Sequence, residues 1–248
     1  MESLHKIMPQ RLQRFQQVQD WQAGQNATHG YELTHGSDRS GALESSRSSS
    51  RLHVTSARDL EICAAVTSAL VRSKCEGVPR ILDFGGEFGQ HFWRLKSALP
   101  NSKLDYTVLD LPKVVKMADP LPGGDLSFVA EVDGLQAHYD VAIASATVQY
   151  LEDPMGAING LMNVATMVVL NRVPLFQIDQ HRVAVQKKNF WSKSADYPSW
   201  FFSRTQFFEK LNIREDETWT FLNSQDKAYF EKTLTSFSCM VFPGRGFK

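Results

Sequence analysis

Apolar residues in the middle of this chain follow two alternating spacings. Short continuous apolar runs, which are typical of buried strands, occur at residues 80–84, 104–109, 126–130, 139–145 and 166–170. Before and between them, apolar residues spaced three or four positions apart predict helices over residues 56–75, 90–99, 112–117 and 154–164. The middle of the chain is therefore predicted to alternate strand and helix.

Strands and helices that alternate this regularly predict right-handed crossovers and a parallel sheet covered on both faces. The last third of the chain changes character. A helix over 203–211 begins with a capping pattern of Ser203 and Gln206, and strand-like runs follow at 217–222 and 235–242. No long helix follows the last run, so we predict an α/β fold with a doubly wound, mostly parallel seven-stranded sheet and an antiparallel last strand.

The first 55 residues are predicted to form a cap and a loop that precede a main domain over residues 56–248. Residues 1–35 are polar and rich in glutamine, and a short helix is expected around residues 12–21. Residues 36–53 are rich in serine and cannot offset their ordering entropy by burial. This stretch is predicted to be a flexible loop that serves either as a lid or as a linker.

Charge and cysteine content narrow the range of partners. The chain has 27 lysines and arginines against 27 aspartates and glutamates, and this balance argues against nucleic acid or an anionic membrane as the main partner. Cys63, Cys75 and Cys239 form no CxxC pair and no cluster with metal spacing, so no metal is expected. The apolar stretches are too short to span a membrane and the first residues lack the apolar core of a secretory signal, so we expect a cytoplasmic protein.

The glycine-rich turn after the strand at residues 80–84 carries the most chemical information. Residues 81–90 read ILDFGGEFGQ, and Asp110 ends the next strand. Such a turn presents backbone amides at the carboxyl edge of the sheet, where open α/β sheets bind ligands. A carboxylate at the end of the next strand can accept hydrogen bonds from both ribose hydroxyls of a nucleoside. Together the two features predict a cofactor that contains a nucleoside.

Spacing within the turn distinguishes two classes of cofactor. A dinucleotide fingerprint, G-x-G-x-x-G, needs its second glycine to let a diphosphate approach the backbone. With Gly85 as the first glycine and Gly89 near the third, Glu87 falls at that second position, where its carboxylate opposes a diphosphate by about 1 kcal/mol or more. S-adenosylmethionine (SAM) has a sulfonium and an ammonium and no phosphate. SAM is therefore favoured over NAD, and Asp83 can face its ammonium end.

The run from Asp83 to Gly89 resembles motif I of class I SAM-dependent methyltransferases, D/E-x-G-x-G-x-G, and residues 106–110 resemble their acidic motif after the second strand. The resemblance implies a Rossmann-like methyltransferase fold with S-adenosylhomocysteine (SAH) as the product. More narrowly, the chain is similar to a bacterial methyltransferase family with an LDFGG-type turn. This narrower likeness spans residues 20–212 and includes residues 30–31, 145, 149–151, 171–174, 186 and 197–198. Glu87 departs from motif I, whose middle glycine it replaces.

Carried over residue by residue, the resemblance implies a set of cofactor contacts. It places Asp83, Gly85 and Gly89 around the methionine part of SAM, and Gly86 and Glu87 of the same turn are also expected to bind the cofactor. It also places Asp110 on the ribose, Leu111 against the adenine, Glu131 and Val132 near the adenine edge, and Ser145 near the sulfonium.

Residues that handle the methyl acceptor are expected after the fourth and fifth strands and in the N-terminal cap. His181 could deprotonate a hydroxyl, or it could simply be solvated. Arg172 could bind a carboxylate or phosphate of the acceptor, or it could form a structural salt bridge. Tyr31, Gln149 and Tyr150 are expected to contact the substrate, with a core position as the alternative for Tyr150.

An aromatic-rich stretch over residues 190–208 has three interpretations. It could line an acceptor pocket, form a homodimer surface, or pack a helix on the sheet through Phe202, Phe207 and Leu211.

The sequence thus predicts a SAM-dependent methyltransferase that modifies an oxygen or nitrogen of a small molecule, such as a sugar or a secondary-metabolite intermediate. Two alternatives stay open. One is an NAD-dependent oxidoreductase, which Glu87 and the lack of a Tyr-x-x-x-Lys pair disfavour. The other is a non-catalytic nucleoside-binding module on the same fold.

Overall fold

The computed structural model describes residues 14–26, 57–118, 125–135, 138–188, 195–230 and 233–245. Tyr31 and the serine-rich residues 36–53 lie outside these ranges, so the expectations for them stay predictions.

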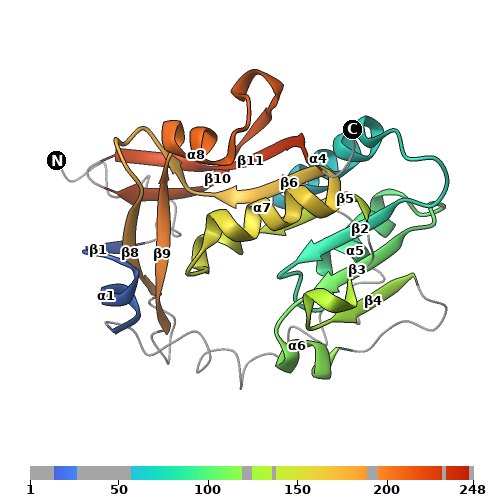
Figure 1. The fold of residues 1–248 in the computed structure, drawn as a ribbon, viewed down its shortest axis with the longest axis horizontal. Helices are drawn as coiled ribbons and strands as arrows, with labels where there is room; N and C mark the ends of the chain where they lie inside the picture. The colour runs from blue at the N-terminus through green and yellow to red at the C-terminus, as the bar shows by residue number, and fades with distance from the viewer. Residues whose placement is uncertain are drawn as a thin grey trace.

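A seven-stranded sheet forms the centre of the molecule (Figure 1). Its strand order is β10-β11-β6-β5-β2-β3-β4. The strands are β2 (Arg80–Phe84), β3 (Asp105–Leu109), β4 (Leu126–Val129), β5 (Tyr139–Ser145), β6 (Ala165–Val173), β10 (Trp219–Phe230) and β11 (Thr233–Pro243). The five adjacent strands β6, β5, β2, β3 and β4 run parallel, and β11 is antiparallel to both of its neighbours, β10 and β6. The predicted fold, including the antiparallel last strand, is confirmed.

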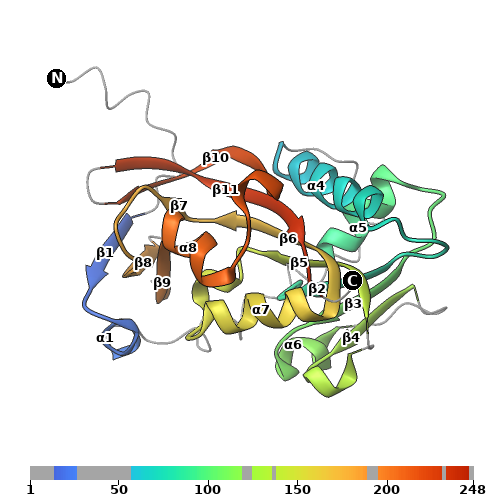
Figure 2. The same cartoon turned by 45° about the horizontal axis from the view of Figure 1, so that its top comes forward.

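Helices cover both faces of this sheet, and Figure 2 shows the two layers. On one face lie α4 (Ala57–Ser73) and α5 (Gln90–Ala98), and on the other lie α7 (Pro154–Val164) and α8 (Arg204–Leu211). The short helix α6 (Pro112–Met117) follows β3. Among the described residues, no helix is long and apolar enough to cross a bilayer.

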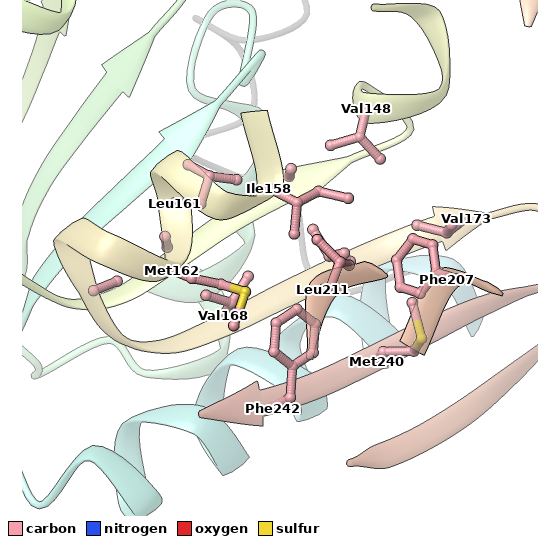
Figure 3. Packing of buried hydrophobic residues seen from close by; sticks show 14 of the residues in the cluster. Val148, Ile158, Leu161, Met162, Val168, Val173, Phe207, Leu211, Met240 and Phe242 are labelled. Atoms are coloured by element: carbon pink, nitrogen blue, oxygen red, sulfur yellow. The ribbon is translucent and has the colours of Figure 1, made fainter. Parts of the chain in front are cut away.

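The core under α7 and α8 holds the sheet in place. Ile158, Leu161 and Met162 of α7 pack near Val168 of β6, while Phe207 and Leu211 of α8 meet Met240 and Phe242 of β11 (Figure 3). All of these side chains are buried. Burial of each side chain of this size stabilises the fold by about 1.5–3 kcal/mol. This core therefore holds the strands of the main sheet in place.

A second, smaller sheet was not predicted from the sequence. Its order is β1-β8-β9-β7, from β1 (Arg14–Val18), β8 (Arg182–Lys188), β9 (Ala195–Ser203) and β7 (Leu175–Phe176). The helix expected over residues 12–21 is wrong, since residues 14–18 form a strand that pairs antiparallel with β8. Pairing with a distant strand overrides the weak local preference of this polar segment, as is common for strands.

Two tryptophans connect α1 with the small sheet and with the loop that follows β5 of the main sheet. The rings of Trp21, which opens α1 (Trp21–Asn26), and Trp200 in β9 stack with centroids 5.8 Å apart. Trp200 Nε1 also donates to the carbonyl oxygen of Leu151, in the loop that follows β5, at 3.0 Å. The small sheet and α1 therefore lie beside the carboxyl end of β5, at one end of the molecule (Figures 1 and 2).

Candidate functional site

Backbone strain gathers at the carboxyl edge of the main sheet. Glu87 (φ 52°), Ala146 (φ 54°) and Arg172 (φ 59°) adopt the left-handed conformation that a Cβ atom disfavours. They lie in the turn after β2, directly after β5 and near the end of β6. Such residues cost on the order of 1–3 kcal/mol each and cluster at ligand sites. The strand order also reverses between β2 and β5, where open α/β sheets bind ligands, so this edge is the candidate site.

The turn after β2 requires glycine at two successive positions. Gly85 has φ 72°, and a Cβ atom there would lie 2.5 Å from the side chain of Thr147. A Cβ atom on Gly86 would lie 2.4 Å from Asp83 Oδ2. The turn is tied to the next strand by a hydrogen bond of 2.8 Å from Gly85 N–H to the carbonyl oxygen of Leu109. The two glycines therefore let the loop after β5 and a buried carboxylate approach the turn from either side.

Asp83 is fully buried beneath this turn and takes part in a polar network. Its Oδ2 accepts from Tyr106 Oη at 2.8 Å and contacts His91 Nδ1 at 3.0 Å. Burial, and then the nearby Asp83, hold the pKa of Tyr106 well above its ordinary value, so that its hydroxyl stays a donor. Asp83 Oδ1 has no hydrogen-bond partner among the described residues. A buried carboxylate oxygen without a donor is costly, so this atom can receive a donor from a ligand.

Asp110 links the glycine turn to the end of β3. Its Oδ2 accepts from Glu87 N–H at 2.8 Å, and its Oδ1 accepts from Leu111 N–H at 2.7 Å. An ionised carboxylate offers about four acceptor positions, so one such group can accept from backbone N–H groups and from ribose hydroxyls at the same time. The backbone bonds also hold the carboxylate in one orientation before any ligand arrives.

The conformation of Glu87 explains the departure from motif I. The φ of 52° is one that glycine adopts without strain, so the backbone of the motif is retained although its glycine is not. The side chain of Glu87 is partly buried at the rim of the turn. Glu87 therefore adds a carboxylate to the site at a position with a glycine-like backbone conformation.

The residues expected near the adenine lie on the exposed rim. Leu111 is 50% exposed and Val132 is 68% exposed, and Glu131 beside it is exposed too. A hydrogen bond of 3.1 Å from Asp110 N–H to the carbonyl oxygen of Val129 ties the ends of β3 and β4 together. Exposed apolar side chains at this rim can cover the flat face of an adenine ring.

Three polar side chains cluster where β5 and β6 end. Ser145 and Asn171 are register partners on these strands, and Asn171 Nδ2 donates to Ser145 Oγ at 3.0 Å. Gln149 lies in the short 3-10 turn Val148–Tyr150, and its Nε2 donates to the carbonyl oxygen of Arg172 at 3.2 Å. The structure thus brings the predicted residues Ser145 and Gln149 together with Asn171.

His181 lies between β7 and β8, where its Nδ1 accepts from the backbone N–H of Ser203 at 3.0 Å. Burial, and then the charge of Lys210, lower the pKa of His181 to about 4, so the ring is neutral at neutral pH. With Nδ1 accepting, the proton sits on Nε2, which has no hydrogen-bond partner among the described residues. These contacts favour a structural role for the ring over the predicted role as a base.

The predicted aromatic cluster divides between the core and the small sheet. Phe202, Phe207 and Leu211 are buried in the core under α7 and α8, so the helix-packing interpretation holds for them. Tyr150 meets Tyr197 of β9 edge-on, with ring centroids 4.9 Å apart. Tyr150 therefore lies at the contact between the main sheet and the small sheet.

The sequence gives no role to Thr147 or Asn171, and it leaves His91 facing either the cofactor or solvent. His91 contacts Asp83, Thr147 packs against Gly85, and Asn171 binds Ser145. Their positions carry a weak signal, since each follows the glycine turn or lies at the end of a strand. Their contacts with other segments depend on the fold and could not be predicted from spacing.

Comparisons with known proteins agree with this description. A family model described as an O-methyltransferase domain matches residues 15–134. No curated protein matches the chain. Among solved structures, the 1,6-didemethyltoxoflavin-N1-methyltransferase of Burkholderia thailandensis, solved with 1,6-didemethyltoxoflavin and SAH, is 16% identical, with 96% of this chain and 97% of that chain covered and a TM-score of 0.52. The N-terminal domain of EvdMO1, solved with SAH and D-fucose, is 12% identical, with 84% of this chain and 97% of that chain covered and a TM-score of 0.49.

The matched family model covers most of β1 in the small sheet and the strands β2, β3 and β4 of the main sheet. The matched residues include the glycine turn and Asp110. The fold shared with the toxoflavin methyltransferase covers nearly the whole chain. The chain therefore has the fold of the class I SAM-dependent methyltransferases, and the family match agrees with the methyltransferase prediction.

Proposed function

We propose that this protein is a SAM-dependent methyltransferase that transfers a methyl group to an oxygen or nitrogen of a small molecule. The observation that carries the proposal is the pair of acidic residues at the glycine turn. Asp110 is held in place by two backbone N–H groups, and Asp83 is buried with one oxygen lacking a partner among the described residues. These residues fit the ribose and the ammonium of SAM.

Charge supports SAM over a dinucleotide. Three acidic residues lie close together in the fold: Asp83 is in β2, Glu87 is in the turn after β2, and Asp110 directly follows the neighbouring strand β3. Their carboxylates favour a cationic ligand and oppose a diphosphate. When bound, SAM supplies a methyl group activated by a positively charged sulfur, and the residues of the chain bind and orient the two reactants.

Three further contacts complete the proposed cofactor site. The turn of Gly85 and Gly86 lies beside the methionine part, Leu111 and Val132 cover the adenine, and Ser145 lies toward the sulfonium. Their positions at the carboxyl ends of β2, β3, β4 and β5 support these assignments. The small-molecule acceptor is supported by the fold shared with a methyltransferase that was solved with 1,6-didemethyltoxoflavin.

Roles on the acceptor side are assigned as follows. Arg172 and Tyr150 are placed near the acceptor because they lie by the ends of β6 and β5. Tyr31 lies outside the described residues, and we propose it as a contact of the substrate. His181 acts as a base only if its ring exchanges the hydrogen bond from Ser203 for one with the acceptor.

Calorimetric titration tests the proposal. SAM and SAH are expected to bind with one site per chain, and NADH is expected to give no binding heat. Binding of NADH without binding of SAM would show the protein to be a dinucleotide enzyme. Binding of SAM without transfer of a labelled methyl group to any metabolite of a broad panel would favour the non-catalytic module.

A further inference from the structure

Two buried amide oxygens at the proposed methyl-transfer end of the site have no hydrogen-bond partner among the described residues. They are Gln149 Oε1 and Asn171 Oδ1. Gln149 is 1% exposed and Asn171 is 4% exposed, so bulk water does not solvate either side chain freely. Buried polar atoms in native proteins almost always have partners, and an exception calls for an explanation such as a bound ligand.

The orientation of the Gln149 amide is fixed by the partner of its nitrogen atom. Gln149 Nε2 donates to the carbonyl oxygen of Arg172, and a carbonyl oxygen can only accept, so Oε1 must point the other way. Asn171 Nδ2 donates to Ser145 Oγ. In this arrangement each side chain has one oxygen, which is an acceptor, without a hydrogen-bond partner among the described residues.

Residues on either side of these amides connect the ends of β5 and β6 to the glycine turn. Thr147 packs against Gly85 of the turn, and its Oγ1 donates to the carbonyl oxygen of Ser145 at 3.1 Å. A shift in register between β6 and β11 at residues 170–173 bends β6 where Asn171 and Arg172 lie. Such irregularities re-aim side chains beside active sites, and this one accompanies the strained backbone of Arg172.

We propose that Gln149 and Asn171 hold the methyl acceptor by accepting hydrogen bonds from its N–H or O–H groups. This inference rests on the proposed function and adds the chemical class of the acceptor, which is an amine or an alcohol. Carboxylate and thiolate acceptors are excluded, because a negative group without a donor would face two carbonyl oxygens and leave both without partners.

The two oxygens act by placement. Hydrogen bonds to Gln149 Oε1 and Asn171 Oδ1 turn the lone pair of the acceptor atom toward the methyl carbon. The acceptor atom forms a bond to that carbon while the carbon–sulfur bond breaks, and the electron pair of that bond stays on sulfur, which becomes neutral. The proton that the acceptor loses passes to water. Both residues are therefore positioning residues that touch the substrate.

The test uses the full chain with SAH bound and two matched sets of probes. The first set is benzylamine, benzyl alcohol, benzoate and benzyl mercaptan, and the second is D-glucosamine, D-glucose and D-glucuronate. Binding at millimolar concentration is followed by saturation-transfer NMR, and transfer is followed with labelled SAM. Gln149→Met and Asn171→Leu remove the oxygens, whereas Gln206→Met removes a glutamine on α8 that donates to a backbone carbonyl in the same way as Gln149 does.

Amines and alcohols are expected to bind the wild-type SAH complex. Gln149→Met and Asn171→Leu are expected to weaken this binding about tenfold or more without changing the affinity for SAH. Gln206→Met is expected to change neither. Asn171→Asp keeps the shape and adds charge, so it should favour each amine over its matched alcohol. If the apolar variants do not fold, an unchanged ratio of amine to alcohol binding in Asn171→Asp overturns the proposal.

Three other results also overturn it. The first is transfer to the carboxylate oxygen of benzoate or D-glucuronate, or to the sulfur of the mercaptan, in preference to the amine or hydroxyl of the matched probes. The second is equal binding of the probes by wild type and both apolar variants. The third is failure of every amine and alcohol to bind the SAH complex. Failure of SAH itself to bind contradicts the proposed function, and the inference about the acceptor falls with it.

Discussion

Replacing Asp110 with alanine probes the cofactor site most sharply, because its carboxylate has two separable jobs. It holds the glycine turn through Glu87 N–H and the end of β3 through Leu111 N–H. In the proposed complex it also accepts hydrogen bonds from both ribose hydroxyls. The first job concerns the stability of the free protein, and the second concerns the affinity for SAM.

The expected magnitudes follow from these contacts. Hydrogen bonds to a charged acceptor contribute about 1.5–3 kcal/mol each, so losing one ribose contact weakens SAM binding by at least about tenfold, and losing both weakens it by at least about a hundredfold. Asp110 is only partly buried, so water can replace it at the two backbone N–H groups. The free energy of unfolding should therefore fall by only about 1–2 kcal/mol.

Calorimetry with SAM measures the affinity, and urea unfolding measures the stability of the same sample. Asp105→Ala is the matched control, since Asp105 begins the same strand at its opposite end and is also partly buried. The control should bind SAM like the wild type. A folded Asp110→Ala variant with wild-type affinity for SAM would refute the ribose role of this carboxylate.

Three further substitutions test other parts of the site. Gly86→Ala would set a Cβ atom against Asp83 Oδ2 and should lower the free energy of unfolding, measured in urea, by about 2 kcal/mol. Gly160→Ala on α7 is the control and should be neutral or stabilising, because a Cβ atom there meets nothing within 4 Å. Equal effects of the two substitutions would contradict the close approach of Asp83. Glu87→Gly should raise the free energy of unfolding by about 1 kcal/mol, because it relieves the backbone strain at φ 52°, and a loss of stability would mean that its side chain matters more than the strain. Burial lowers the pKa of His181 from 6.5 to about 4, so the contribution of its neutral ring to stability is complete above about pH 6.5 and is lost as the pH falls toward 4. Over this pH range the free energy of unfolding should therefore fall less in His181→Gln than in the wild type. Parallel pH profiles of the two proteins would refute the burial of the ring.

The main sheet could be predicted from the sequence because its strands are buried on both faces. Runs such as residues 81–83 and 141–144 are fully buried, and continuous apolar runs separated by helical spacing are their direct signature. The carboxyl edge and the acidic residue at the end of β3 follow from the same pattern. The positions of the glycine turn and of Asp110 at this edge could therefore be predicted without a structure.

The small sheet was not accessible in this way. β1 is polar, and β1, β8 and β9 depend on one another across about 170 residues of chain, so no local pattern indicates them. Contacts between segments were missed for the same reason. His91 to Asp83, Thr147 to Gly85 and Gln149 to Arg172 each join positions that spacing alone cannot relate.

The central claim is that the turn after β2 binds SAM between Asp83 and Asp110. A crystal structure of the SAH complex tests it most directly. The account predicts both ribose hydroxyls within hydrogen-bond distance of the Asp110 carboxylate, the amino group of SAH on the side of Asp83 Oδ1, and the sulfur toward Ser145. A nucleoside bound elsewhere, a diphosphate against Glu87, or a turn closed over Asp110 by its own side chains would contradict it.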